Sequence, residues 1–198
     1  ILEISIVTFL LAISGAVAQF PVGKISDVYD RRKVIIASTF GAAIFALITI
    51  FVSGQMYLPD GLATSKKWFY LFFILFSFCS LPMFSLILAH TNDYITKDKF
   101  VAAGAGLQFT FGLGAMSGPF LCSIFMDLVG SNGFFVFLFF FHSLIGAFGI
   151  YRMRVREPIE NPDSQFVAMP QTITPAGIEL NPTTEPIEEP TKDENKEI

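Results

Sequence analysis

The chain of 198 residues is 53% hydrophobic, carries a net charge of −4 and contains 24 phenylalanines. Charged residues make up only 15% of it, against about 25% in a typical soluble domain. A soluble fold would expose too much apolar surface to water, and the acidic balance excludes the basic footprint of a nucleic-acid-binding protein. The two cysteines, Cys79 and Cys122, lie inside apolar runs, so no disulfide framework is predicted.

Five apolar runs follow one another, at about 4–22, 34–54, 68–90, 101–126 and 134–151. Each approaches the roughly 20 residues with which a helix crosses the ~30 Å hydrocarbon core of a bilayer. The last run, FFVFLFFFHSLIGAFGIY, does not alternate polar and apolar residues as a barrel strand would. Residues 1–151 are therefore predicted to form an all-α, polytopic transmembrane helical bundle.

The charges predict how this bundle is oriented. Residues 152–198 hold ten of the 17 acidic residues and seven of the 11 prolines, which predicts a disordered acidic tail. Nine Lys and Arg follow the first, third and fifth runs, whereas only Lys66 and Lys67 follow the second and none follows the fourth. The positive-inside rule places the first set of loops and the tail in the cytoplasm.

The loop after the first run reads GKISDVYDRRKVI, from Gly23 to Ile35. Gly23 is suited to ending a helix and turning the chain sharply. Asp27 can accept hydrogen bonds from the free N–H groups of a helix N-terminus. Arg31 and Arg32 can clamp that carboxylate or bind anionic lipid headgroups. The alternative is a solvated basic loop that only obeys the positive-inside rule.

This loop resembles the cytoplasmic signature of the major facilitator superfamily, G-x-L-a-D-r-x-G-r-k-x-x-l, in which Gly23, Asp27, Arg31 and Arg32 match. Val28 and Asp30 depart from it, because a basic residue and a glycine are usual there. The segments QFPVGKISD, SLPMFSLILAHTNDYI and FVAAGAGLQFTFGLGAMSGPF together resemble the YcaD-like branch of bacterial transporters, in which an aspartate replaces that glycine.

The resemblance covers residues 1–151 and implies helices 8 to 12 of a twelve-helix transporter. The implied activity is transport of a small solute by alternating access through the bacterial inner membrane, with proton coupling as one option. The implied partners are the solute, the lipid bilayer and the missing N-terminal half of the same protein.

A glycine-rich face is predicted in the fourth run, where Gly112, Gly114 and Gly118 precede Pro119. Small residues let a second membrane helix approach to backbone contact, and Pro119 favours a kink. The run resembles the antiporter motif of the superfamily, which implies a gating role. A packing seam without gating is the alternative.

Polar residues inside the runs are candidates for a substrate or proton site. His90 and Asp93 share a helix face, as a proton-linked pair, as two metal ligands or as a polar helix end. No third ligand is evident, so neither a metal nor another cofactor is predicted. The resemblance places Gln19 and Gln108 beside the central cavity, although each could form an interhelical hydrogen bond instead. His142 is interpreted as a neutral histidine bonded to a neighbouring helix.

Three classes of function remain open at this stage. Transport is the leading one, and a non-transporting scaffold or sensor that uses the acidic tail is the second. A membrane-embedded enzyme would need a nucleophile and base, or a metal constellation, at one depth. The sequence offers neither, so the chain is predicted not to be an enzyme and no catalytic residue is proposed.

Overall fold

The computed structural model describes residues 2–55, 62–96, 99–156 and 166–169. Within these residues the chain is entirely helical apart from short connections. The elements are α1 (Leu2–Val28), α2 (Arg31–Gln55), α3 (Leu62–Ser80), α4 (Met83–Asn92), α5 (Phe100–Val129), the 3-10 turn η2 (Gly130–Asn132) and α6 (Gly133–Val155). The helices contain the five predicted apolar runs, and each helix extends beyond its run at one or both ends.

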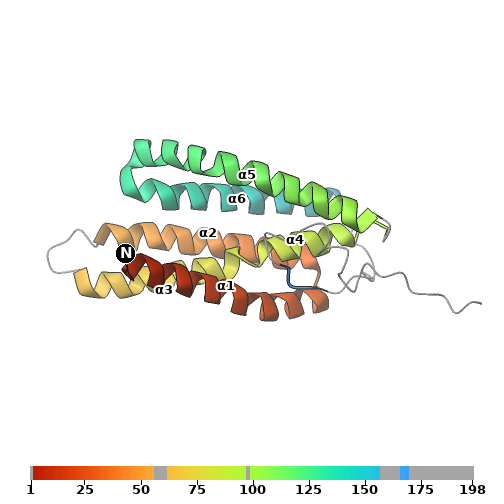
Figure 1. The fold of residues 1–198 in the computed structure, drawn as a ribbon, viewed down its shortest axis with the longest axis horizontal. Helices are drawn as coiled ribbons and strands as arrows, with labels where there is room; N and C mark the ends of the chain where they lie inside the picture. Colours follow the sequence, from red (N-terminus) through yellow and green to blue (C-terminus); the bar gives the residue numbers. More distant parts are fainter. Residues whose placement is uncertain (1, 56–61, 97–98, 157–165, 170–198) are drawn as a thin grey trace, which may run out of the picture.

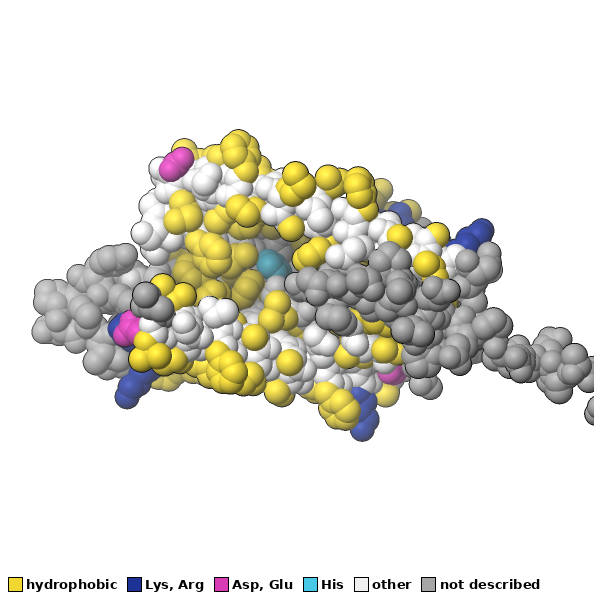
Figure 2. All heavy atoms as spheres, viewed as in Figure 1, with side chains coloured by type: hydrophobic (Ala, Val, Ile, Leu, Met, Phe, Trp, Pro, Cys, Tyr) yellow, Lys and Arg dark blue, Asp and Glu magenta, His cyan; other side chains and the backbone are white. Residues whose placement is uncertain are grey.

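Four continuous stretches are long and apolar enough to cross a membrane: Leu2–Val28, Arg31–Ser53, Lys66–Asn92 and Phe100–Val155. The last has 56 residues and contains both α5 and α6, which run side by side in opposite directions (Figure 1). On the face shown in Figure 2, hydrophobic side chains cover the middle of the bundle and charged side chains gather toward its ends. The predicted all-α membrane bundle is therefore confirmed.

Helix α2 packs between two groups of helices, with the pair α5 and α6 on one side and α1 with α3 on the other (Figure 1). Its contacts depend on small residues. Ala42 and Ala46 are fully buried in a cluster with Phe76 of α3. On the opposite side, a side-chain carbon at Gly146 of α6 would lie 2.9 Å from the ring of Phe40. Small residues allow such close approach, which replaces hydrophobic driving force in a lipid environment.

Two serines join α1 to α3 across their contact. The Ser14 hydroxyl donates to the carbonyl oxygen of Ile74 at 2.9 Å, and the Ser77 hydroxyl donates to that of Leu11 at 2.8 Å. Each hydroxyl is thereby satisfied by the opposite helix, as an apolar surrounding requires.

The third predicted run, 68–90, is not one uninterrupted helix. Helix α3 ends at Ser80 and α4 begins at Met83, with Leu81 and Pro82 between them. Pro82 has no N–H to donate, and its ring excludes the carbonyl one turn earlier from a normal helical position. Helix α5, in contrast, continues through Pro119, where the sequence predicts a kink.

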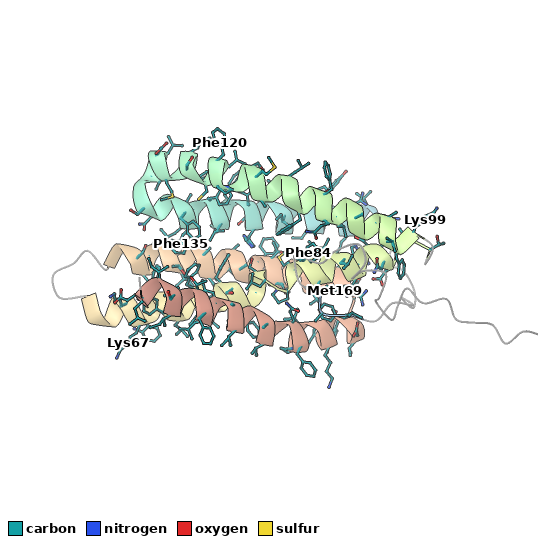
Figure 3. All side chains as sticks on the ribbon, viewed as in Figure 1. Lys67, Phe84, Lys99, Phe120, Phe135 and Met169 are labelled. Atoms are coloured by element: carbon teal, nitrogen blue, oxygen red, sulfur yellow. The ribbon has the colours of Figure 1, made fainter. Side chains whose placement is uncertain are left out.

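The predicted tail, 152–198, is described only in part. Residues up to Val155 continue α6, and the segment Phe166–Met169 lies against the helical bundle. Met169 is only 6% exposed and lies near the α1 and α4 end of the bundle (Figure 3). The remaining tail residues, and with them most of the predicted disorder, lie outside the described residues.

Candidate functional site

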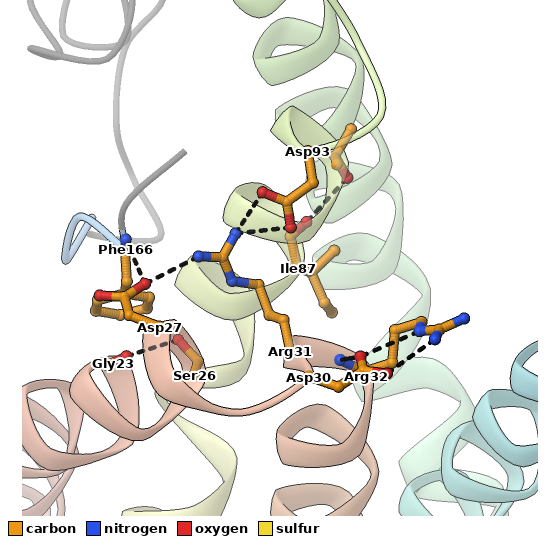
Figure 4. A network of polar contacts seen from close by, with 10 residues as sticks. Gly23, Ser26, Asp27, Asp30, Arg31, Arg32, Ile87, Asp93 and Phe166 are labelled. Carbon is orange, nitrogen blue, oxygen red and sulfur yellow. Dashed lines mark hydrogen bonds and ion pairs between the residues drawn. The ribbon is translucent and has the colours of Figure 1, made fainter. Parts of the chain in front are cut away.

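Arg31 joins three helices at one end of the bundle (Figure 4). Its Nη1 donates to both carboxylate oxygens of Asp93, at 2.7 and 2.8 Å, directly after α4. Its Nη2 donates to Oδ1 of Asp27, near the end of α1, at 3.0 Å. The Arg31 side chain is 4% exposed, so this is a buried, charge-assisted network in which a bidentate contact fixes the guanidinium plane.

The two carboxylates differ in burial. The Asp93 side chain is 5% exposed, whereas that of Asp27 is 36% exposed. Asp27 also accepts a hydrogen bond at 2.9 Å from the backbone N–H of Phe166, which lies 139 residues further along the chain. The match between Asp27 and Arg31 therefore has a physical basis, and Asp27 is the more accessible member of the network.

Gly23 does not end a helix, contrary to the sequence-based expectation. Helix α1 continues past it to Val28, and the Ser26 hydroxyl donates to the Gly23 carbonyl oxygen at 2.7 Å. A side-chain carbon at Gly23 would overlap the ring of Phe166. The glycine therefore makes room for a distant segment, and sequence reasoning assigned it a local turn instead.

The hydrogen bonds at the start of α2 come from Asp30 and not from Asp27. Asp30 Oδ1 accepts from the backbone N–H of Arg32 at 3.0 Å, as an N-cap carboxylate does. The Arg32 side chain adds hydrogen bonds to both Asp30 oxygens, at 3.1 and 2.8 Å. These side-chain bonds are the main cause of a lowered pKa for Asp30. The residue that departs from the general signature thus has a structural role.

The second arginine of the loop also ties α2 to α6. Arg32 Nη1 donates to the carbonyl oxygen of Arg156, just beyond α6, at 2.8 Å. The predicted clamp therefore separates into two: Arg31 binds Asp27 and Asp93, and Arg32 binds Asp30 and the end of α6.

His90 packs edge-on against Tyr94, with 5.0 Å between the ring centres, while Asp93 is engaged by Arg31. This arrangement favours the polar helix end among the three interpretations of His90 and Asp93. The described residues contain no group of three or more His, Cys, Asp and Glu side chains that could hold a metal ion.

His142 bonds to its own helix and to α3. Because the Leu138 carbonyl can only accept, Nδ1 carries the proton of that 2.8 Å bond, and Nε2 of the neutral ring accepts from the Ser80 hydroxyl at 3.0 Å. The expected neutral, interhelically bonded histidine agrees with this geometry.

The two glutamines remain candidates for substrate contacts. Gln19 is half-buried in α1 and makes no hydrogen bond in the described part of the chain. The Gln108 oxygen Oε1 in α5 is buried and has no partner among the described residues. The structure does not bring the two together by a hydrogen bond, so each stands as a separate candidate.

The predicted glycine face has no neighbour within the described chain. No described atom lies within 4 Å of a side-chain carbon placed at Gly112, Gly114 or Gly118, and Pro119 is exposed. The tight glycine contacts lie elsewhere, where Gly146 and Gly149 of α6 face α2. Their spacing of three residues was the sequence signal for this contact.

Sequence reasoning missed the segment Phe166–Met169. The Ser85 hydroxyl donates to the Met169 carbonyl at 2.9 Å and accepts from the Met169 N–H at 3.1 Å. Phe166 packs on the cluster of Val22, Val34 and Leu86. The available signal was FVAM itself, an apolar run inside an otherwise polar and proline-rich stretch.

A bundle of long apolar helices with its charges at the ends defines a multi-pass integral membrane protein. Residues 1–186 match the profile of the Major Facilitator Superfamily. The chain belongs to this superfamily, whose members are transporters and not enzymes.

The relatives found are distant. An uncharacterised MFS-type transporter of Yersinia enterocolitica is 26% identical over 129 residues, which cover 65% of this chain and 30% of that protein. Uncharacterised MFS-type transporters of Yersinia pestis and Yersinia pseudotuberculosis are 23% identical over the same length and shares. The chain thus spans about a third of the length of these relatives. No solved structure matches it.

Proposed function

We propose that the chain forms helices 8 to 12 of a YcaD-like transporter, which moves a small solute by alternating access through a bacterial cytoplasmic membrane. The loop from Gly23 to Ile35 and the order of the apolar helices support this assignment. Helices α3 and α4 together would form the tenth helix. The nine cationic residues near one end place that end, and the tail, in the cytoplasm.

The Arg31 network is the observation that carries the proposal. It ties α1, α2 and the end of α4 together at the end that must open and close if access alternates. Asp93 anchors Arg31 in the interior, while Asp27 is accessible enough to exchange partners. In this mechanism Asp27 biases the equilibrium between the two conformations by about 1–3 kcal/mol, the usual size of such couplings.

The remaining candidates take subordinate roles. The open face of Gly112, Gly114 and Gly118 packs against helices of the other half, and Pro119 weakens the hydrogen-bond ladder beside it. Of the polar residues, Gln108 is the preferred substrate contact because its buried oxygen lacks a partner in the described chain.

The test is Asp27→Asn in the full-length protein, with Asp30→Asn as the matched control. Both replace one loop carboxylate by an amide, but only Asp27 contacts Arg31. We expect uptake or efflux to fall about 5- to 150-fold for Asp27→Asn at matched expression and to be nearly unchanged for Asp30→Asn. Normal transport by Asp27→Asn would remove the proposed switch.

A further inference from the structure

A groove of about 430 Å³ opens between α2, α4 and α6 at the charged end of the bundle. Its walls are apolar and come from all three helices, with Ile36 of α2, Ile87 of α4 and Phe148 of α6 among them. Its rim carries Arg152 and Arg156. The volume lies in the range of small-molecule sites, and the combination of apolar walls with a cationic rim suits an amphiphile.

The two rim arginines are set apart by their lack of a carboxylate partner. Among the described residues, neither Arg152 nor Arg156 forms an ion pair, whereas the guanidinium of Arg32 is bound by Asp30. Arg156 instead lies over the ring of Tyr94, with its central carbon 4.1 Å from the ring centre. Arg152 and Arg156 are four residues apart on one helical face, where two like charges repel. An anion between them would relieve this repulsion.

The position along the bundle identifies the kind of anion. Arg152 follows the last apolar run directly, so its guanidinium lies at the depth of the lipid headgroups once α6 spans the membrane. Basic pockets between membrane helices on the cytoplasmic side are suited to anionic headgroups. A small free anion would satisfy the arginines but would leave the isoleucine and phenylalanine walls in contact with water.

We propose that this groove binds an anionic phospholipid of the cytoplasmic leaflet. The headgroup phosphate lies between Arg152 and Arg156, and an acyl chain covers the walls formed by Ile36, Ile87 and Phe148. The site differs from the Arg31 network, because that network is already neutralised by Asp27 and Asp93. The cytoplasmic assignment of this end rests on the proposed function; lipid binding itself does not depend on the solute transported.

The test compares melting temperatures of the purified full-length protein in detergent after addition of phosphatidylglycerol, phosphatidylcholine or inorganic phosphate. We expect phosphatidylglycerol to raise the melting temperature by about 2–4 °C more than either of the others. The double variant Arg152→Gln/Arg156→Gln should lose this difference. Arg154→Gln should keep it, because Arg154 lies in the same last turn of α6 but does not line the groove.

Native mass spectrometry supplies a readout that does not depend on how the double variant folds. The wild type and Arg154→Gln should retain phosphatidylglycerol in preference to phosphatidylcholine. Equal retention of the two lipids by both proteins, or an equal loss of preference in Arg154→Gln, would overturn the proposal. A full effect from inorganic phosphate would assign a free anion to the site.

The acidic residues that follow Arg156 are the competing occupant. A phosphatidylglycerol effect that appears only after Glu157→Gln, Glu160→Gln and Asp163→Asn would show that the chain's own tail fills the groove, and would overturn the lipid assignment. Asp27→Asn should retain the full lipid effect, so failure of the switch mechanism and failure of the lipid site give different results.

Discussion

Arg31 contacts two carboxylates that differ in depth, and this difference assigns them different tasks. Asp93 holds the guanidinium through two hydrogen bonds in the interior, while Asp27 holds it through one at a partly exposed position. Stability therefore depends mainly on Asp93, and the capacity to exchange partners depends mainly on Asp27.

Asp93→Asn is expected to destabilise the protein more than Asp27→Asn. Removing one partner of a buried ion pair costs about 3–5 kcal/mol, because the remaining charge is left in the interior. The partly exposed pair is screened by solvent, so its loss should cost about 1 kcal/mol or less. Chemical unfolding of the two purified variants measures the difference, and a larger loss for Asp27→Asn would contradict the assignment.

Asp30 should give the stability of the protein a dependence on acid pH. Its pKa is lowered in the folded protein, chiefly by the Arg32 side chain. A lowered folded-state pKa means that the contribution is present above the ordinary aspartate value of about 4 and is lost as the pH falls through the folded-state value.

The stability difference between wild type and Asp30→Asn should accordingly shrink between neutral pH and about pH 3, since asparagine still caps the helix but cannot ionise. Melting curves over that range test it. A difference that stays constant with pH would show that the Asp30 charge does not contribute.

At the scale of the helices, the contact of α2 with α6 depends on glycines that bring the two backbones together. Gly146→Leu should lower stability by about 1–3 kcal/mol, because its side chain must displace the ring of Phe40. Ala147→Leu is the matched control, since the neighbouring position on the same helix is exposed. Thermal melts of both variants measure the effect, and equal melting temperatures would show that α6 can move away from α2 without loss.

The helices themselves were predictable from the sequence, because a continuous apolar run of about 20 residues has few structural alternatives. The interruption at Pro82 was not, since hydropathy remains high across it and only the missing N–H of proline marks the site. Gly23 illustrates a different limit. Its neighbours in the sequence favour a helix end, but the residue that requires a glycine there is Phe166, far along the chain.

The signature residues of the candidate site were found from the sequence, but their pairing was not. Arg31 and Arg32 are adjacent in the chain and leave the start of α2 in different directions. Arg31 therefore reaches Asp27 and Asp93, and Arg32 reaches Asp30 and the end of α6. Spacing alone cannot separate these partners.

For the whole molecule, the uneven distribution of charge predicts its orientation in the membrane. Lys67 and Lys99 lie at opposite ends of the bundle (Figure 3). A cysteine at Lys67 should react with an impermeant maleimide in intact cells, whereas one at Lys99 should react only after permeabilisation. The reverse pattern would invert the proposed topology, and both substitutions leave the Arg31 network untouched.

The contact between Asp27 and Phe166 also sets an order of events during synthesis. The two residues are 139 positions apart, so at about 5–20 residues per second a ribosome makes Phe166 roughly 7–28 s after Asp27. Helices α1 to α4 have all been translated by then, and Asp27 can already pair with Arg31. The strap from Phe166 to Met169 is therefore added to a network that exists before it, and a nascent chain arrested before residue 166 should show the Gly23 surface still open to a chemical probe.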